Sequence, residues 1–391
     1  MLIGLVGRPN SGKSTFFKAA TLADVLIAPY PFATIKPNHG IAYIKIPDLA
    51  KEFGKVSNPR EGYVKFGLRF VPFELMDVAG LVEGASEGKG LGNEFLSDLA
   101  GADAFIHVVD LSGEFDGGGK PTKDYYPGND IMIIEKELDL WYSGILKKVW
   151  KVFSRTIEIQ HTNFAESVAR QFSGLKVTAD DVKHLMLKVN LNYEKPSSWT
   201  ENEIFQFARE LRRYTKPMIV AANKVDTING PANFEKIKKG FDYPMVPCFA
   251  DGELALREAD KHGLIEYIPG ESDFKILKEL NGKQTQALEN IKKTMIQFKS
   301  TGVQEVLNKT VLDILQYIAI YPAGEKLADF KGNILPDCYL MKDGSTALDF
   351  AYRIHSDIGK NFVKAIDVRT KKAVGKDHKL KHMNGFEIIT K

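Results

Sequence analysis

The chain has 391 residues, of which 44% are hydrophobic and 26% charged, and its formal net charge is only +3 at neutral pH. This length corresponds to two or three domains, and the balanced charge argues against polyanion binding by the chain as a whole. Cys248 and Cys338 lie far apart, without a CxxC pattern or neighbouring histidines, which argues against a disulfide framework or a zinc site. Without a leader-like or membrane-spanning apolar run, we expect a soluble, cytoplasmic protein.

The first predicted strand, at residues 2–6, ends in a glycine-rich loop, and a helical run follows at 15–20. The loop reads Gly7-Arg8-Pro9-Asn10-Ser11-Gly12-Lys13-Ser14, which matches the phosphate-binding pattern G-x-x-x-x-G-K-[ST]. Such a loop turns backbone N–H groups toward a polyphosphate, while its lysine meets the β- and γ-phosphates and its serine binds Mg²⁺. We therefore predict a nucleotide site formed by Arg8, Pro9, Asn10, Ser11, Gly12, Lys13, Ser14 and Thr15.

Two later positions have the chemistry of a nucleotide-dependent switch. Thr34 lies in the proline-flanked segment 29–34, and its hydroxyl can complete a Mg²⁺ shell when a γ-phosphate is present. Asp77 follows the apolar run 70–76, which places its carboxylate at the C-terminal edge of a sheet, where it can hold Mg²⁺ through water. The N–H of Gly80 can then meet the γ-phosphate, and we expect the glycine-rich residues after it to form a second mobile element. The predicted catalytic residues are Lys13, Thr34 and Gly80, and the predicted metal ligands are Ser14, Thr34 and Asp77.

Residues 131–214 have helical rather than strand periodicity. Two segments begin with capping-box patterns, Thr178-x-x-Asp181 and Thr200-x-x-Glu203. An earlier helix carries apolar residues in steps of three or four, at Ile134, Leu138, Trp141, Ile145, Val149 and Val152. We predict an all-helical insertion whose apolar stripes pack helix against helix.

A base-reading motif follows the predicted strand at 218–222. It reads Asn223-Lys224-Val225-Asp226. The Asp226 carboxylate can accept hydrogen bonds from N1–H and the exocyclic amino group of guanine, a pair of donors that adenine lacks. Asn223 can tie loops together and reach the base edge, and the Lys224 stem can cover the ring. The motif therefore favours guanine over adenine.

Short apolar runs recur at 2–6, 70–76, 104–109, 218–222 and 245–249, separated by helical segments. This alternation is typical of an α/β domain with a mostly parallel sheet that is covered by helices on both faces.

The C-terminal third begins with helical patterns. One helix is marked by Leu288, Ile291, Met295 and Phe298. We expect a second helical run from 311 to 320, ended by Tyr321-Pro322. The last seventy or so residues predict a small mixed domain with a turn at Asp343-Gly344 and a helix capped by Thr346-x-x-Asp349.

Residues 360–382 contain eight basic residues against two acidic ones, Asp367 and Asp377. The basic residues are Lys360, Lys364, Arg369, Lys371, Lys372, Lys376, Lys379 and Lys381. A charge run of this kind is most often a solvated face, but it can also hold RNA electrostatically.

Several stretches closely resemble the Obg family of GTPases: the loop at 7–14, the segment 30–40 with Phe32-Ala33-Thr34, and the segment 77–92. The helical insertion and the stretch 346–355, which looks like a TGS domain, narrow the resemblance to the YchF-related branch. It implies a P-loop GTPase domain over 1–128 and 215–320, a coiled-coil-like helical insertion over 129–214 and a β-grasp TGS domain over 322–391.

The resemblance also implies a cytoplasmic GTP- and GDP-binding switch with weak, Mg²⁺-dependent hydrolysis. Its relatives meet the ribosome, which implies contact with the ribosome or rRNA through the basic TGS surface and the helical insertion. It implies no membrane contact, and a monomer is favoured.

Three departures from common GTPase patterns matter. YchF proteins proper resemble ATPases and lack the Lys and Asp of the base-reading motif. This chain keeps Lys224 and Asp226, and so it looks like the archaeal and fungal relatives that read GTP. The fifth motif usually contains Ser-Ala, and the best match here is Phe249-Ala250-Asp251, in which we expect Ala250 to offer its N–H to guanine O6. Leu81 stands where Ras-like GTPases have a water-orienting glutamine.

An aliphatic side chain at Leu81 cannot polarise a nucleophile, so we expect slow hydrolysis. We hypothesise that Asn10 helps to bind K⁺ against the phosphates, as in related GTPases with this asparagine. Two alternatives stay open: an ATPase that accepts adenine, and a nucleotide-stabilised scaffold with little hydrolysis.

Overall fold

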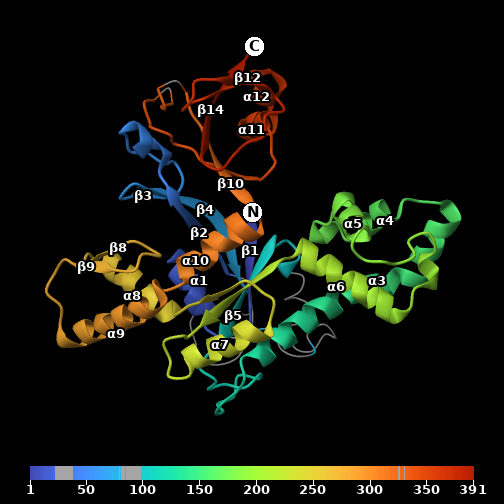
Figure 1. Cartoon of the computed structure of the whole chain (residues 1–391), viewed down its shortest axis with the longest axis horizontal. Coiled ribbons are helices and arrows are strands. Elements are labelled where there is room, and N and C mark those ends of the chain that lie inside the picture. Colours follow the sequence, from blue (N-terminus) through green and yellow to red (C-terminus); the bar gives the residue numbers. More distant parts are fainter. Residues whose placement is uncertain (23–37, 79, 81–83, 85–97, 325, 330) are drawn as a thin grey trace. The chain divides into compact units, whose positions relative to one another are not determined.

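A computed structural model describes residues 1–22, 38–78, 80, 84, 98–324, 326–329 and 331–391 (Figure 1). Thr34, Leu81 and most of the glycine-rich segment after Gly80 lie outside these residues. The chain divides into two compact units. The first contains Met1–Gly40 and Glu74–Val306, and the second contains Ile41–Phe73 and Leu307–Lys391.

The main sheet has the order β2-β4-β1-β5-β6-β7, with β3 paired to β4. Its strands are β1 (Leu2–Val6), β2 (Asn38–Pro47), β3 (Tyr63–Lys65), β4 (Leu68–Asp77), β5 (Ala104–Asp110), β6 (Met218–Asn223) and β7 (Met245–Pro247). β1 runs parallel to β4 and β5, and β6 runs parallel to β5 and β7. Every residue of β5 and β6 is buried, as expected for strands covered on both faces. All five strands predicted for this sheet are confirmed.

Four described helices lie wholly within the first unit and outside the insertion. They are α1 (Lys13–Thr21), α7 (Gly230–Gly240), α8 (Ala250–Lys261) and α9 (Gly282–Phe298), and a hairpin of β8 (Ile265–Tyr267) and β9 (Phe274–Ile276) lies between the last two. The predicted helix at 288–298 is confirmed, and its Leu288 and Met295 join a core that includes Val220 and Phe234. Among the described helices, none combines the length and apolar character needed to cross a bilayer.

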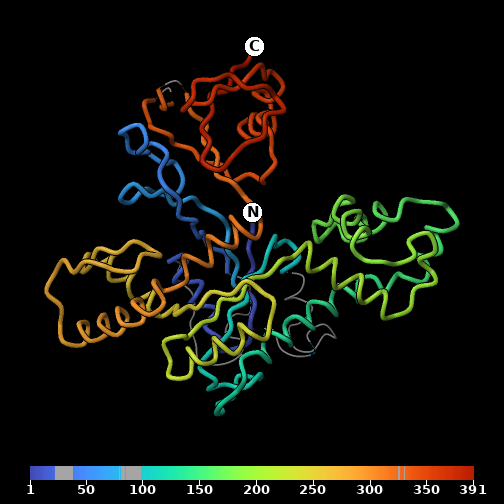
Figure 2. The backbone as a smooth tube through the Cα atoms, in the orientation of Figure 1, coloured from blue at the N-terminus to red at the C-terminus, as the bar shows by residue number. Residues whose placement is uncertain are grey.

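The helical insertion is present between β5 and β6. It consists of α3 (Gly128–Gln160), α4 (Phe164–Gln171), α5 (Ala179–Met186) and α6 (Glu201–Thr215), with short 3-10 turns at Ser173–Leu175 and Pro196–Ser198. The backbone leaves β5, follows α3 outward and returns along α6 to β6, so that α3 and α6 lie side by side (Figures 1 and 2). Both predicted capping boxes are confirmed, at Thr178 and Thr200.

The apolar stripe of α3 agrees only in part with the predicted one: Trp141 and Ile145 pack, partly buried, against the core of the insertion, but the fully buried positions are different ones. The buried apolar side chains after Leu138 are Tyr142, Leu146, Trp150 and Ile157. Val152, which we assigned to the stripe, is 73% exposed. Residues spaced by four drift slowly around a 3.6-residue helix, so two neighbouring stripes both satisfied the apolar spacing. The aromatic rings of the insertion decide between them, since Trp150 packs against Trp199 with ring centroids 5.0 Å apart.

The second unit is built around a five-stranded sheet with the order β11-β10-β14-β12-β13. Its elements include β10 (Tyr317–Pro322), β11 (Tyr339–Lys342), α11 (Ala347–Ile354), α12 (Ser356–Lys360), β12 (Phe362–Asp367), β13 (Ala373–Val374) and β14 (Asn384–Thr390). Phe350 and Phe386 lie in its core. The capping box at Thr346 is confirmed, and Gly344 has the positive φ of 81° that the predicted turn requires.

The helical run expected over 311–320 is wrong in its second half. α10 (Val303–Asn308) continues as a π-helix over Lys309–Ile314, Gln316 takes a left-handed conformation, and β10 begins at Tyr317. The sequence Tyr-Ile-Ala-Ile-Tyr is rich in β-branched and aromatic residues, and it finds sheet partners in β11 and β14. Short apolar runs of this kind cannot be assigned from periodicity alone.

Candidate nucleotide site

The glycine-rich loop joins β1 to α1 through a backbone that requires glycine. Gly12 has φ 91°, and a Cβ atom there would meet Nδ2 of Asn223 at 2.3 Å. It is the residue before the first turn of α1, whose backbone N–H groups lack partners within the helix. The loop therefore presents a helix N-terminus, which attracts an anion.

Lys13 begins α1, and its side chain is buried, with 7% exposed. Its Nζ donates to the carbonyl oxygen of Arg8 at 3.0 Å. Burial lowers the pKa of Lys13 to about 8, although the charge of Asp77 acts in the opposite direction. A buried ammonium that is held by a backbone carbonyl can exchange that partner for a phosphate oxygen.

Ser14 and Asp77, two of the predicted metal ligands, are in contact. The Ser14 hydroxyl donates to Oδ2 of Asp77 at 2.7 Å. Asp77 is fully buried at the end of β4, its Oδ1 has no hydrogen-bond partner among the described residues, and burial raises its pKa. A hydroxyl and a carboxylate with an unpartnered oxygen suit Mg²⁺, which typically takes one or two protein ligands and keeps several waters. No cluster of three or more His, Cys, Asp or Glu that could hold a metal occurs among the described residues.

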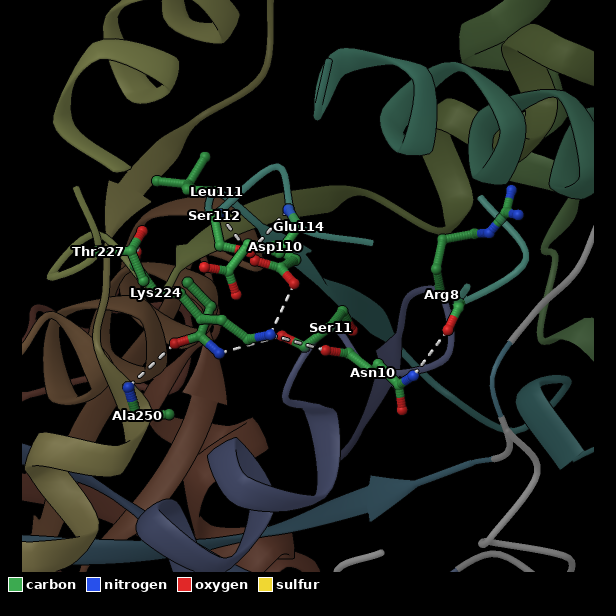
Figure 3. Close-up of polar contacts among 12 residues, drawn as sticks. Arg8, Asn10, Ser11, Asp110, Leu111, Ser112, Glu114, Lys224, Thr227 and Ala250 are labelled. Carbon is green, nitrogen blue, oxygen red and sulfur yellow. Dashed lines mark hydrogen bonds and ion pairs between the residues drawn. The ribbon is translucent and has the colours of Figure 1, made fainter. Parts of the chain in front are cut away.

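The base-reading motif lies beside the phosphate-binding loop. Asn223 ends β6, and its side chain donates to the carbonyl oxygen of Ser11 at 3.1 Å while accepting from the N–H of Ala250 at 3.0 Å. Lys224 donates to the carbonyl oxygen of Asn10 at 3.0 Å and pairs with Asp110 at 2.6 Å (Figure 3). The side chains of Asn223 and Lys224 thus connect the phosphate-binding loop, the loop at Asp110 and the start of α8, which are far apart in sequence.

Asp226 and the fifth-motif residues lie at the same edge of the sheet. The N–H of Val225 donates to the carbonyl oxygen of Cys248 at 3.0 Å, which links the two loops. Asp226 is exposed, and its pKa is raised by partial desolvation and by the nearby charge of Asp251. Phe249 precedes α8, and Ala250 and Asp251 form its first turn. The N–H of Ala250, which we expected to face the base, is engaged by Asn223 instead.

Arg8 and Gly80 take different places around the loop. A Cβ atom at Gly80 would meet the nitrogen of Pro9 at 2.9 Å, so Gly80 lies directly against the phosphate-binding loop. The Arg8 side chain is only 5% exposed and extends away from the loop toward Gly117. Within the part of the chain that the structure describes, its Nε and Nη1 have no hydrogen-bond partner. The Arg8 carbonyl, rather than its guanidinium, contacts Lys13.

The segment after β5 adds contacts that the sequence interpretation missed. The side-chain nitrogen of Asn10 donates to the carbonyl oxygen of Gly119 at 3.1 Å. Nζ of Lys224 lies 5.2 Å from the centre of the Phe115 ring, in addition to its ion pair with Asp110. Asp110 ends a predicted strand, as Asp77 does, so its position was a usable signal. The contacts of Phe115 and Gly119 have no sequence signal, since they join segments about a hundred residues apart.

Family models match three parts of the chain. Residues 2–142 match a 50S ribosome-binding GTPase model, residues 221–325 match the G4 motif-containing domain of Obg-like GTPases of the YGR210-like type, and residues 318–390 match the TGS domain. An uncharacterized GTP-binding protein of Methanocaldococcus jannaschii is 44% identical over 394 residues, covering 100% of this chain and 99% of the relative. The ribosome-binding ATPase YchF of Bacillus subtilis is 30% identical, covering 93% of this chain and 87% of its own length. The chain belongs to the Obg family of GTPases, in its YchF-related branch.

Two further relatives agree with this membership in the YchF-related branch. An uncharacterized GTP-binding protein of Schizosaccharomyces pombe is 35% identical, covering 89% of this chain and 88% of the relative. The crystal structure of a GTP-binding protein from Pyrococcus horikoshii is 39% identical, with a TM-score of 0.80 and full coverage of both chains. The predicted family, nucleotide-hydrolase class and fold class, with its helical insertion and TGS domain, are therefore confirmed. The domain limits stay predictions.

Proposed function

We propose that this YchF-related protein binds GTP and Mg²⁺ at the loop formed by residues 8–15 and hydrolyses GTP slowly as a switch. The observation that carries the proposal is the double hydrogen bond of Asn223. It ties Ser11 of the phosphate-binding loop to Ala250 beside the base-reading motif. This connection holds the phosphate and base ends of the site at a fixed separation, which suits one particular ligand, a nucleotide.

In the proposed complex, Asp226 accepts the N1–H and amino hydrogens of guanine, and Lys224 covers the ring. Because the N–H of Ala250 is engaged by Asn223, we assign the contact with O6 to the next N–H, that of Asp251. Asp251 lies in the first turn of α8, where N–H groups have no partner within the helix. Phe249 supports this turn by donating its N–H to the carbonyl oxygen of Thr301 at 3.0 Å.

The test of guanine recognition is the Asp226→Asn variant. An asparagine can donate to O2 of xanthine but repels the amino group of guanine, so we expect GTP binding to weaken by about 10²-fold or more and xanthosine triphosphate binding to strengthen. Calorimetric titration with both nucleotides measures the exchange. Asp242→Asn, an exposed aspartate outside the site, is the matched control. Equal GTP affinity in the Asp226→Asn variant and wild type would refute the assignment.

For the reaction, we assign Mg²⁺ to Ser14, Asp77 and Thr34, the γ-phosphate to Lys13 and Gly80, and a K⁺ ligand to Asn10. The amide nitrogen of Asn10 is held by Gly119, which leaves its oxygen directed elsewhere (Figure 3). Amide oxygens are suitable ligands for hard cations.

Potassium dependence is tested by comparing GTP turnover in KCl and NaCl. We expect faster turnover in KCl, and loss of this difference in an Asn10→Ala variant that still binds GDP. Equal rates in the two salts would exclude the K⁺ role while leaving GTP binding intact.

We also propose that the switch acts on the ribosome in the cytoplasm. Two observations support this: the B. subtilis relative is named ribosome-binding, and all eight basic residues of 360–382 are exposed in the second unit. The exposed basic stretch fits a non-sequence-specific contact with rRNA, to which the helical insertion adds a second surface. We expect the protein to act as a monomer.

An ATPase is the second candidate, because the B. subtilis relative is named an ATPase. Competition between ATP and GTP in one titration decides between them. Single-turnover hydrolysis with and without ribosomes, in KCl, then separates a working switch from a scaffold that binds GTP without cleaving it.

A further inference from the structure

A buried carboxylate of the helical insertion contacts the segment that follows Gly80. Glu137 lies on α3 and is only 2% exposed. Its Oε1 accepts the backbone N–H of Gly84 at 2.7 Å. Burying a carboxylate is costly unless it is hydrogen-bonded. The hydrogen bond from Gly84 therefore stabilises the buried Glu137 carboxylate and holds Gly84 against α3.

Gly84 is suited to be held in this way. It is buried and has φ 87°, a left-handed conformation that strains any other residue. It follows Gly80, which lies against the phosphate-binding loop, by only four residues. Gly80 and Gly84 are therefore close together along the chain.

A residue at the end of the insertion also hydrogen-bonds to the chain just before β5. Lys216, the residue that follows α6, is 1% exposed. Its Nζ donates to the carbonyl oxygens of Ala100, at 2.9 Å, and of Ala102. α3, which carries Glu137, and α6, which Lys216 follows, are joined by a buried ion pair, with Nη2 of Arg212 2.6 Å from Oδ1 of Asp139. Glu137 and Lys216 thus hydrogen-bond to the described backbone, at Gly84 and at Ala100 and Ala102 respectively.

We propose that Glu137 is a positioning residue that docks the backbone at Gly84 on α3, so that binding of a γ-phosphate at Gly80 is transmitted to the helical insertion. It acts through the N–H of Gly84 and touches neither nucleotide nor metal. α3 is a single helix of 33 residues, so a change at its Glu137 turn reaches the far end of the insertion. The inference rests on the proposed function, because it requires a GTP-dependent movement of Gly80.

The experiment measures hydrogen exchange by mass spectrometry with GDP and with a non-hydrolysable GTP analogue. In the wild type we expect the peptide containing Gly84 and peptides of α3 to differ between the two nucleotides by about fivefold or more in exchange rate. In Glu137→Leu, which keeps bulk but removes the acceptor, this difference should disappear from α3. Glu137→Gln keeps an acceptor oxygen and should restore most of it.

Lys136→Ala is the matched control, because Lys136 is the adjacent, exposed residue on the same helical turn. It should behave as the wild type. If Glu137→Leu does not fold, as judged by thermal unfolding, Glu137→Ala removes the same acceptor and should also abolish the nucleotide-dependent difference in α3.

A folded Glu137→Leu variant with undiminished nucleotide-dependent exchange in α3 would overturn the proposal, and so would a Glu137→Ala variant with that result where Glu137→Leu does not fold. So would a wild type that binds both nucleotides without any difference in α3. GDP titration of the wild type is performed alongside: if guanine nucleotides do not bind at all, it is the proposed function that fails.

Discussion

Lys13 and Lys376 carry the same ammonium group in opposite surroundings. Lys13, in the first unit, is buried beside Asp77 and has a lowered pKa, whereas Lys376, in the second unit, is exposed within a basic stretch. A buried charge has few possible partners and strong interactions with each of them, while an exposed charge interacts weakly and is screened by salt. The two units should therefore respond very differently to the loss of one charge.

The largest effect is expected from Lys13→Ala. It removes the one ammonium buried in the phosphate-binding loop, and charge-assisted hydrogen bonds to phosphate contribute about 1.5–3 kcal/mol each. We expect GDP and GTP affinity to fall by about 10²-fold or more, as measured by titration with a fluorescent nucleotide. Lys18→Ala, in the last turn of the same helix, should bind normally. Retention of affinity by the Lys13 variant would show that the buried lysine is a structural residue only.

In the second unit, several charges have to be changed before binding responds. We expect ribosome co-sedimentation in low salt to fall by about tenfold or more in the triple variant Lys371→Glu, Lys372→Glu, Lys376→Glu. We also expect binding of the wild type to weaken steeply as salt is added. Lys236→Glu, Lys238→Glu, Lys239→Glu on α7 changes the net charge equally and is the matched control. Equal loss in both triple variants would assign the effect to total charge, and persistence of binding in the first would exclude the basic stretch as the contact.

The arrangement of sheet and site was largely predictable, because it depends on motifs whose positions are fixed by strand ends. Asp77 and Asn223 both terminate parallel strands, so their meeting with Ser14 and Ser11 follows from topology. What could not be predicted depends on long-range contacts. The use of the Ala250 N–H by Asn223 is one example, and the docking of Gly84 on Glu137 is another, since neither has a local sequence signature.

The strand at β10 and the rotated stripe of α3 have a different cause. Both were misassigned because an apolar run satisfies more than one local pattern, and tertiary partners decide which is used. Tyr317 and its neighbours pair with β11, and Trp150 packs near Trp199. Local signals with a specific polar partner, such as the capping boxes at Thr178, Thr200 and Thr346, were correct in every case.

The pH dependence of nucleotide binding tests the buried member of the comparison, Lys13. With a pKa of about 8, Lys13 is more than half neutral at pH 8.5 in the free protein, whereas a bound phosphate favours its charged form. Binding should therefore take up a proton, and GDP affinity should fall as the pH rises above 8, by at most about tenfold per pH unit. Calorimetry in two buffers with different ionisation enthalpies measures the uptake. Lys13→Arg, whose guanidinium keeps its proton, should show none, and equal uptake by both proteins would assign the proton to another group.

The smallest effect is expected from Glu52→Gln, at an exposed ion pair of the second unit. Arg369 donates from Nε and Nη2 to the two oxygens of Glu52, at 2.6 and 2.8 Å, and this bond lowers the pKa of Glu52. Because both side chains are in contact with solvent, the variant should lose less than about 1 kcal/mol of unfolding free energy at pH 7. The pair stabilises the fold only while Glu52 is ionised, so the difference from wild type should be fully present above the ordinary glutamate pKa and should vanish as the pH falls through the lowered pKa of Glu52. Glu61→Gln, at a nearby exposed glutamate, is the control in the same thermal unfolding series. A loss well above 1 kcal/mol, or one that persists in acid, would mean that this exposed pair behaves like the buried charges of the first unit.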